Sequence, residues 1–352
     1  MCATLLDDLE TYNPDTLDLS KDTEAADYWF SIIDEIINKF AKQAVASQKE
    51  IDPTSEERAE RFKKSYKDQV ENMRNSKNNN KPITIRDLLE LNETTLRLYG
   101  FQDPWLKQKT EENEASIKLF KSRLDEIDKL KNVDRWTELI RGVLAGNIFD
   151  WGAKEVSDIL EKDKTFGLHD ALDKIQKRPW LIDNLNEWNL RMQETPHKCA
   201  VIFVDNSGAD VILGILPFAR ELLKRQTKVL LCANSEPALN DVTYKELEDI
   251  LQKCSCYCDT INSALKNGQL LVYANGQKGP CLDMRHLTPE LCNAIESNET
   301  DLLVIEGMGR ALHTNLYAKF RCDTLKLAVV KNKWLANRLG GDTFSVICKY
   351  ES

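Results

Sequence analysis

The second half of the chain alternates short apolar runs with amphipathic segments. Runs rich in leucine and β-branched residues, without polar interruptions, predict strands that are buried on both faces. Between the first two runs, from Asp210 to Arg225, apolar positions recur at three- and four-residue spacing, which predicts a helix that Pro217 would kink or shorten. Strands that alternate with helices predict an α/β fold with a doubly wound, mainly parallel sheet. The six apolar runs are 198–204, 228–233, 270–274, 302–305, 325–330 and 344–348.

The first 191 residues show helical periodicity instead. Asp27 to Ala46 carries an apolar stripe at three- and four-residue spacing, and Pro53 to Glu57 has the pattern of a capped helix start. No convincing strand pattern occurs in this part. We therefore expect an all-helical N-terminal region, residues 1–191, followed by an α/β domain, residues 192–352.

One segment of the first half, Leu139 to Leu160, departs from this routine. Glycines punctuate an apolar helix there, and Asn147 and Asp150 place polar groups where packing alone would want none. One interpretation is that this turn docks closely against the α/β domain and contributes Asn147 or Asp150 to a site. Ordinary helix packing with capping explains the pattern equally well.

Polar residues follow the first two predicted strands. Asp205 and Asn206 come directly after the first strand, and Asp241 lies in the loop after the second. In an open α/β sheet, ligands bind outside the carboxyl ends of the strands, so the two loops could face each other. Two carboxylates and an amide oxygen suit Mg²⁺ or Mn²⁺ and are tolerable for Co²⁺ or Ni²⁺. An Asx turn that caps the next helix is an equal alternative.

The fourth predicted strand ends in the string EGMGR, Glu306 to Arg310. Its two glycines would allow backbone N–H groups to face an anion, and Arg310 offers a bidentate fork for phosphate. The dinucleotide fingerprint GxGxxG is incomplete, so hydride transfer loses its main support. Lys331 lies at the carboxyl end of the fifth strand, where a cation would meet a phosphate, and Lys326 lies near its beginning. With a metal at the same edge, the pattern indicates phosphoryl transfer to water.

Composition excludes some classes of function. A net charge of −9 argues against nucleic-acid binding, and the 352 residues contain no run of about 18 apolar residues that would span a membrane. The first residues lack a basic region followed by an apolar stretch, so we expect no signal peptide. The ten cysteines are therefore expected to be reduced in a cytoplasmic protein. The oligomeric state stays open.

Several strings in this sequence also resemble one known family. FVDNSGAD, ALNDVT, EGMGRALHTN and LKLAVVKN, with AGNIFDWGAKEV and RPWL in the first half, are closely similar to the metal-dependent damage-control phosphatases. The similarity runs from roughly Asp27 to Glu351 and is greatest to the branch with the EGMGR motif. That branch includes stand-alone enzymes and 4'-phosphopantetheine phosphatase domains fused to a pantothenate-kinase-like domain. No kinase-like segment precedes the similarity, so we expect a stand-alone protein.

The resemblance implies a Rossmann-like α/β domain with one divalent metal at Asp205, Asn206 and Asp241. It also implies a small phosphate ester as substrate, 4'-phosphopantetheine and its oxidised or damaged forms, removed before they enter coenzyme A. Lys326 falls where a related branch has the lysine of an Arg-Thr-x-Lys motif, although Asp323 and Thr324 stand at the two Arg-Thr positions. The residues expected on the substrate side are Glu306, Gly307, Met308, Gly309, Arg310, Lys326, Asn147 and Asp150.

The expected reaction is hydrolysis of a phosphate monoester, with Asp205, Asn206, Arg310 and Lys331 as the catalytic residues. Attack by a metal-activated water and attack by Asp205 itself both stay open. Ser207 stands where the haloacid-dehalogenase pattern has a second Asp, which favours water. The alternatives are a broad sugar-phosphate phosphatase, a protein-carboxyl methyltransferase and a module that only binds a protein partner. The methyltransferase alternative expects a glycine-rich loop after the first strand, where this chain has only Gly208.

Overall fold

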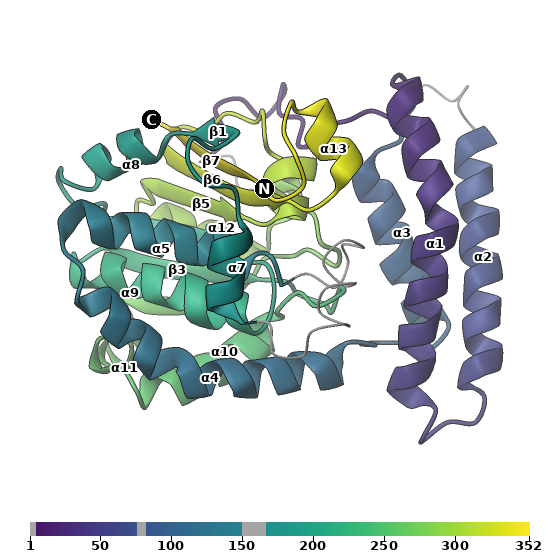
Figure 1. The fold of residues 1–352 in the computed structure, drawn as a ribbon, viewed down its shortest axis with the longest axis horizontal. Coiled ribbons are helices and arrows are strands. Elements are labelled where there is room, and N and C mark those ends of the chain that lie inside the picture. Colours follow the sequence, from purple (N-terminus) through teal and green to yellow (C-terminus); the bar gives the residue numbers. More distant parts are fainter. Residues whose placement is uncertain (1–4, 76–81, 150–166) are drawn as a thin grey trace.

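The structure is a computed structural model that describes residues 5–75, 82–149 and 167–352. Its strands form one seven-stranded sheet (Figure 1). The strands are β1 Ile182–Asp183, β2 Cys199–Phe203, β3 Lys228–Ala233, β4 Leu270–Ala274, β5 Leu302–Glu306, β6 Asp323–Val330 and β7 Ser345–Glu351. Their order in the sheet is β1-β7-β6-β5-β2-β3-β4, and every neighbouring pair is parallel except β6 and β7. The predicted α/β fold with a mainly parallel sheet is confirmed.

All six predicted runs form strands. β3 and β4 begin and end where their apolar runs do, although β3 is buried over nearly its whole length and β4, at the edge of the sheet, is only partly buried. The expectation that the first 191 residues are all helical is wrong at one point, since β1 pairs in parallel with β7. Two residues are too short to show a strand period.

Helices cover both faces of the sheet (Figure 1). One face shares a hydrophobic core with α4 Leu106–Asp128, α5 Asn132–Gly146, α7 Leu168–Lys174, α8 Leu185–Arg191, the π-helix η1 Asp210–Ile215, α9 Leu216–Lys224, α10 Tyr244–Ser255 and α11 Asp259–Lys266. The other face packs against the 3₁₀ turn η2 Met284–His286, α12 Pro289–Ser297, the π-helix η3 Met308–His313 and α13 Lys333–Arg338. The described helices thus cover most of both faces, and the ends of the strands are where a site is expected.

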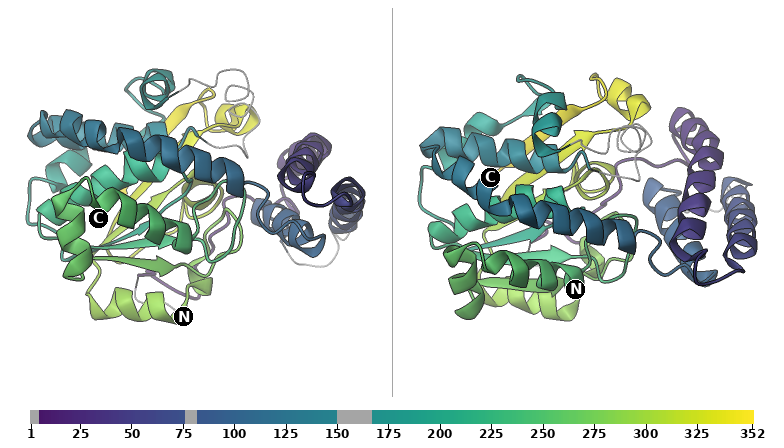
Figure 2. Two further views of the ribbon diagram at one scale, coloured as in Figure 1. Left: turned by 90° about the horizontal axis from the view of Figure 1, so that it is seen from below. Right: turned by 60° about the horizontal axis from the view of Figure 1, so that its bottom comes forward.

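Three further helices form a separate group beside the sheet, coloured purple to blue in Figure 2. They are α1 Thr23–Gln48, α2 Ser55–Asn75 and α3 Ile85–Leu98, and they bury a core of their own. α4 and α5 share the core of the sheet instead. The division at residue 191 stays a prediction. Among the described helices, none has the length and apolarity that a membrane crossing requires.

Glycines bring α5 and η1 into backbone contact. A Cβ added to Gly214 would lie 3.0 Å from the carbonyl oxygen of Gly142, and one added to Gly146 would lie 2.7 Å from the Cα of Asp210. The predicted close docking of this segment is thus confirmed. The helix predicted from Asp210 forms as a π-helix that becomes α-helical at Leu216, next to Pro217. α5 ends at Gly146 and presents Asn147 to the carboxyl edge of the sheet.

Candidate active site

The predicted site loops meet where β2 lies between β3 and β5, at the point where the strand order reverses. A β-bridge pairs Asn206 with Asp241, and the Val242 N–H donates to the carbonyl oxygen of Asp205 at 3.0 Å. The predicted proximity of these two loops is confirmed. Glu306, the last residue of β5, lies at the same edge.

Arg310 lies between the two loops. Its guanidinium group is fully buried and forms ion pairs with Asp205 and with Asp241, the latter at 2.8 Å. It also donates to the side-chain oxygen of Asn234 at 2.9 Å. Burial opposes the charge of Arg310, but Asp241 and Asp205 raise its pKa further above the ordinary arginine value. A permanent positive charge therefore joins the two carboxylates.

Asn234 was not predicted as a site residue. It follows β3 directly, and its amide nitrogen donates to Asp241 at 3.0 Å while its oxygen accepts from Arg310. Its place directly after a buried strand is the same signal that identified Asp205 after β2. The sequence therefore offered a way to find it.

The glycines of EGMGR permit close approaches. Gly307 has a φ of +104°, and a Cβ there would lie 2.3 Å from the Cγ of Asp205. A Cβ on Gly309 would lie 2.1 Å from the carbonyl oxygen of Pro280. The expectation that the Gly307 N–H faces an anion is wrong, because it donates to the carbonyl oxygen of Leu327 on β6 at 3.0 Å. Met308 is half-buried and packs against the hydrophobic core on the face of the sheet that carries α12 and α13.

Asn147 joins several parts of the site. Its side-chain nitrogen lies 2.9 Å from Asp205 Oδ2, 3.4 Å from Asp210 Oδ2 and 3.4 Å from Glu306 Oε1. Its carbonyl oxygen accepts from the Lys331 ammonium group at 2.7 Å. Of the two interpretations of this turn, the structure favours the one in which it brings a polar group to the site. Asp150 lies outside the described residues.

Three carboxylates form a tight buried cluster. Carboxylate oxygens of Asp205, Asp210 and Glu306 lie within 4.8 Å of one another. Burial raises the pKa of Asp205 to about 8 although Arg310 opposes the rise, and burial also raises the pKa of Asp210 and, strongly, that of Glu306. Asp210 Oδ1 and Glu306 Oε2 accept no hydrogen bond from a donor group of the described residues. Burial and mutual repulsion thus disfavour ionisation of these carboxyl groups unless a further positive charge lies beside them.

This donor set fits a divalent cation. When all groups are ionised, four negative charges face two positive charges, an excess of two. The negative charges are those of Asp205, Asp210, Asp241 and Glu306, and the positive charges are those of Arg310 and Lys331. Hard oxygen atoms are the ligands that Mg²⁺ and Mn²⁺ prefer. Two overlapping candidate ligand sets lie here, the predicted Asp205, Asn206 and Asp241, and the carboxylate cluster described above. Asp205 belongs to both.

The two predicted lysines have different surroundings. Lys331 contacts Asn147 and so belongs to the site. The Lys326 ammonium group instead donates to the carbonyl oxygen of Ala318 at 2.7 Å and pairs with Glu351 at 2.8 Å, and burial lowers its pKa to about 8. The structure does not bring Lys326 to the carboxylates, and its contact with substrate stays a prediction.

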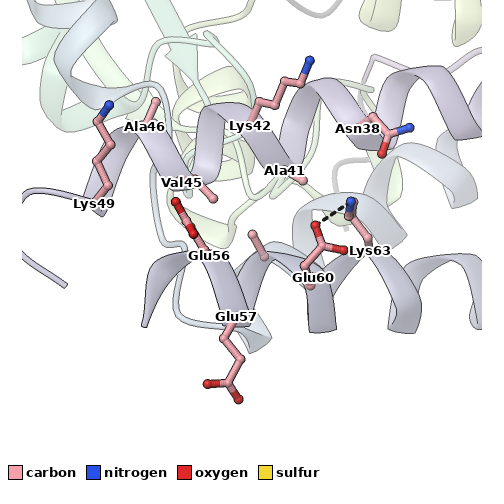
Figure 3. Close-up of a pocket in the computed structure, with 11 residues that line it drawn as sticks. Asn38, Ala41, Lys42, Val45, Ala46, Lys49, Glu56, Glu57, Glu60 and Lys63 are labelled. Atoms are coloured by element: carbon pink, nitrogen blue, oxygen red, sulfur yellow. Dashed lines mark ion pairs between the residues drawn. The ribbon is translucent and has the colours of Figure 1, made fainter. Parts of the chain in front are cut away.

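A cavity of about 730 Å³ lies elsewhere, between α1 and α2 (Figure 3). Its charged lining mixes both signs, for example Lys42 and Lys49 with Glu56, and Glu60 is paired with Lys63 at 2.6 Å. It shares no residue with the carboxylate cluster. The sheet edge is therefore the candidate active site.

Known proteins are similar to this chain in sequence or in fold. The profile described as the damage-control phosphatase ARMT1-like domain matches residues 32–347. A 4'-phosphopantetheine phosphatase of Mus musculus is 41% identical over 99% of this chain, and the chain spans 48% of that protein, about half its length. A damage-control phosphatase of Arabidopsis thaliana is 37% identical over 92% of this chain and 87% of its own length.

A crystal structure of a DUF89 family protein from Pyrococcus horikoshii has a TM-score of 0.58 at 15% identity, over 92% of this chain and 98% of that chain. It supports the fold alone. The profile match and the Arabidopsis relative carry the family assignment, and they confirm the resemblance seen in the sequence. This chain belongs to the family of damage-control phosphatases with an ARMT1-like domain.

Proposed function

We propose that this chain is a metal-dependent phosphatase of small phosphate monoesters, and that 4'-phosphopantetheine and its oxidised or damaged forms are its preferred substrates. The family and the name of the mouse relative support the reaction and the substrate class. The observation that carries the proposal is the meeting of the Asp205 and Asp241 loops around one buried arginine. We expect the reaction to take place in the cytoplasm.

Asp205, Asn206 and Asp241 would hold the divalent cation, Mn²⁺, Co²⁺, Ni²⁺ or Mg²⁺. When bound, such a cation would neutralise negative charge on the phosphoryl group during its transfer to water. When all are ionised, the carboxylates of the cluster together with Asp241 carry two more charges than Arg310 and Lys331, which supports this assignment. Asp210 and Glu306 lie close enough to contribute to the same cation or to hold the proton that water gives up.

The other side chains fix the geometry of these acids. Arg310 holds the carboxylates of Asp205 and Asp241 at one separation, and Asn147 ties Asp205 to Glu306. Arg310, which is paired with Asp205, and Lys331, which donates to Asn147 beside the cluster, would stabilise charge on the phosphate oxygens. In the reaction the ester P–O bond breaks, a P–O bond to the water oxygen forms, a carboxylate takes a proton from the water, and a proton passes to the departing oxygen, which leaves as the alcohol.

The test is phosphate release from 4'-phosphopantetheine, its S-sulfonate and fructose 1-phosphate, with each cation or with EDTA. We expect Asp205→Asn to lower kcat/KM at least about 100-fold. Glu290→Gln, at an exposed position on α12, is the matched control and should not change it. Equal rates on fructose 1-phosphate would assign a broad sugar-phosphate phosphatase instead. Absence of hydrolysis with every cation would refute the proposal.

A further inference from the structure

Helix α4 contacts both loops that carry the proposed metal ligands. The Gly208 N–H, in the loop after β2, donates to the side-chain oxygen of Asn113 at 2.7 Å. One helical turn earlier, the Lys109 ammonium nitrogen lies 3.5 Å from the carbonyl oxygen of Asp241. Residues four positions apart lie on the same face of a helix, so a single face of α4 reaches both loops.

Lys109 is held firmly in its place. It is fully buried, and its ammonium group forms ion pairs with Asp103 at 2.8 Å and with Glu246 at 2.8 Å. Burial opposes its charge, but the two carboxylates raise the pKa of Lys109 above the ordinary lysine value. Glu246 also accepts from the Thr243 N–H at 2.8 Å, which caps α10. Lys109 thus fixes the chain on both sides of Thr243, from Asp241 into α10.

The backbone of the first loop lies directly on α4. Gly208 has a φ of +76°, and a Cβ added there would lie 3.0 Å from the Cβ of Glu112. The two loops are also joined to each other, because the Ser207 N–H donates to the carbonyl oxygen of Asn240 at 2.9 Å. α4 and the loops therefore form one closed set of contacts around the metal ligands.

We propose that Asn113 and Lys109 are positioning residues that set the spacing of the two ligand loops and thereby the metal affinity. Both act through the loop backbone and not through the ligand atoms. The inference rests on the proposed function, since it takes Asp205, Asn206 and Asp241 as the ligands. Groups that hydrogen-bond metal ligands directly contribute roughly 10- to 100-fold to metal affinity, and we expect the lower end of that range for contacts made through the loop backbone.

The experiment is a calorimetric titration of Mn²⁺ into the metal-stripped full chain. Asn113→Leu keeps the size of the side chain and removes the acceptor, so we expect about tenfold weaker binding or more. Asn113→Asp keeps an acceptor for the Gly208 N–H and should bind no more weakly than wild type. Glu114→Leu, at an exposed position on α4, is the matched control and should bind like wild type.

Two further measurements separate positioning from a general loss of structure. The thermal midpoint in EDTA should be the same for Asn113→Leu and Glu114→Leu, while amide exchange at Gly208 should be faster only in Asn113→Leu. Lys109→Met combined with Glu246→Gln removes one charge of each sign, retains a cap for Thr243, and should also weaken Mn²⁺ binding.

The outcomes distinguish a failure of the proposed function from a failure of the positioning role alone. If wild type binds neither Mn²⁺ nor another divalent cation, the proposed function fails and the positioning role fails with it. If wild type binds Mn²⁺ and both Asn113→Leu and the double variant bind it equally well, the positioning role alone is refuted. Weaker binding in both variants at an unchanged midpoint in EDTA supports the role.

Discussion

Glu93 carries a buried carboxyl group that the proposed reaction does not use. Its side chain, on α3, is 3% exposed, and it accepts a hydrogen bond from the amide of Asn92 at 3.0 Å. Burial raises the pKa of Glu93 from 4.5 to about 8; Arg97 and the Asn92 bond oppose the rise, and Asp241 adds to it. The folded protein therefore holds a neutral Glu93 at pH 7, whereas the unfolded chain ionises it.

The sign of the pH effect follows from this difference. Between pH 4.5 and pH 8 the folded state keeps a proton that the unfolded state loses, so the free energy of unfolding falls as pH rises. Each pH unit lowers the free energy of unfolding by at most about 1.4 kcal/mol, so the loss between pH 5 and pH 7 is about 2 to 3 kcal/mol. Glu93→Gln keeps the acceptor for Asn92 and removes the titration. The variant should therefore exceed wild type by about 3 kcal/mol at pH 7 and by about 1 kcal/mol at pH 5.

The assay is urea unfolding followed by circular dichroism at pH 5, 6 and 7 in EDTA, so that metal binding does not contribute. Glu111→Gln, at an exposed position on α4, serves as the control and should follow the pH dependence of wild type. If the difference between wild type and Glu93→Gln is the same at pH 5 and pH 7, Glu93 is not protonated in the folded protein and the reasoning fails.

The remaining predictions concern two glycines and the metal. Gly307→Ala puts a Cβ 2.3 Å from Asp205 Cγ at a φ of +104°, so kcat/KM for phosphate release should fall at least about 100-fold, and unchanged turnover would contradict the contact. Gly214→Ala puts a Cβ 3.0 Å from the Gly142 carbonyl oxygen and should lower the free energy of unfolding in urea by about 1 to 3 kcal/mol. An unchanged free energy would contradict the close contact of α5 and η1. Mn²⁺ at 100 times its Kd should add about 2.7 kcal/mol to the unfolding free energy of wild type and much less to that of Asp205→Asn, and equal gains would place the ion elsewhere.

Regular apolar patterns were sufficient to predict most of the sheet. β3 is an uninterrupted run because it lies between two strands and is buried over nearly its whole length, whereas β4 keeps the same apolar pattern at the edge of the sheet, where four of its five residues are only partly buried. β1 has only two residues and is defined by its pairing with β7, which no local pattern encodes. The π-helix η1 packs closely on Gly142 through Gly214, and Gly142 is a residue far away in the sequence. The amphipathic period alone therefore indicated an ordinary helix.

The site was predictable where it depends on the edge of the sheet. Asp205 and Asp241 follow strands, and parallel strands bring their carboxyl ends together. Asp210 was not predicted, because an Asp at the start of a helix is usually a cap, and only the packing of η1 turns its carboxylate toward Glu306. For Lys326, in contrast, the sequence suggested a site role that its surroundings in the structure do not support. Its motif position suggested substrate, but on β6 its side chain meets Glu351.

The bonds of Asn147 also determine when the site can form. This one residue reaches partners 58, 159 and 184 positions further along the chain, at Asp205, Glu306 and Lys331. Closing loops of this length costs entropy before the contacts repay it, so structures that depend on distant pairings form slowly. We expect a refolding chain to regain its helices early and its hydrolytic activity last. A nascent or partly folded chain would then lack the assembled site that the proposed hydrolysis requires.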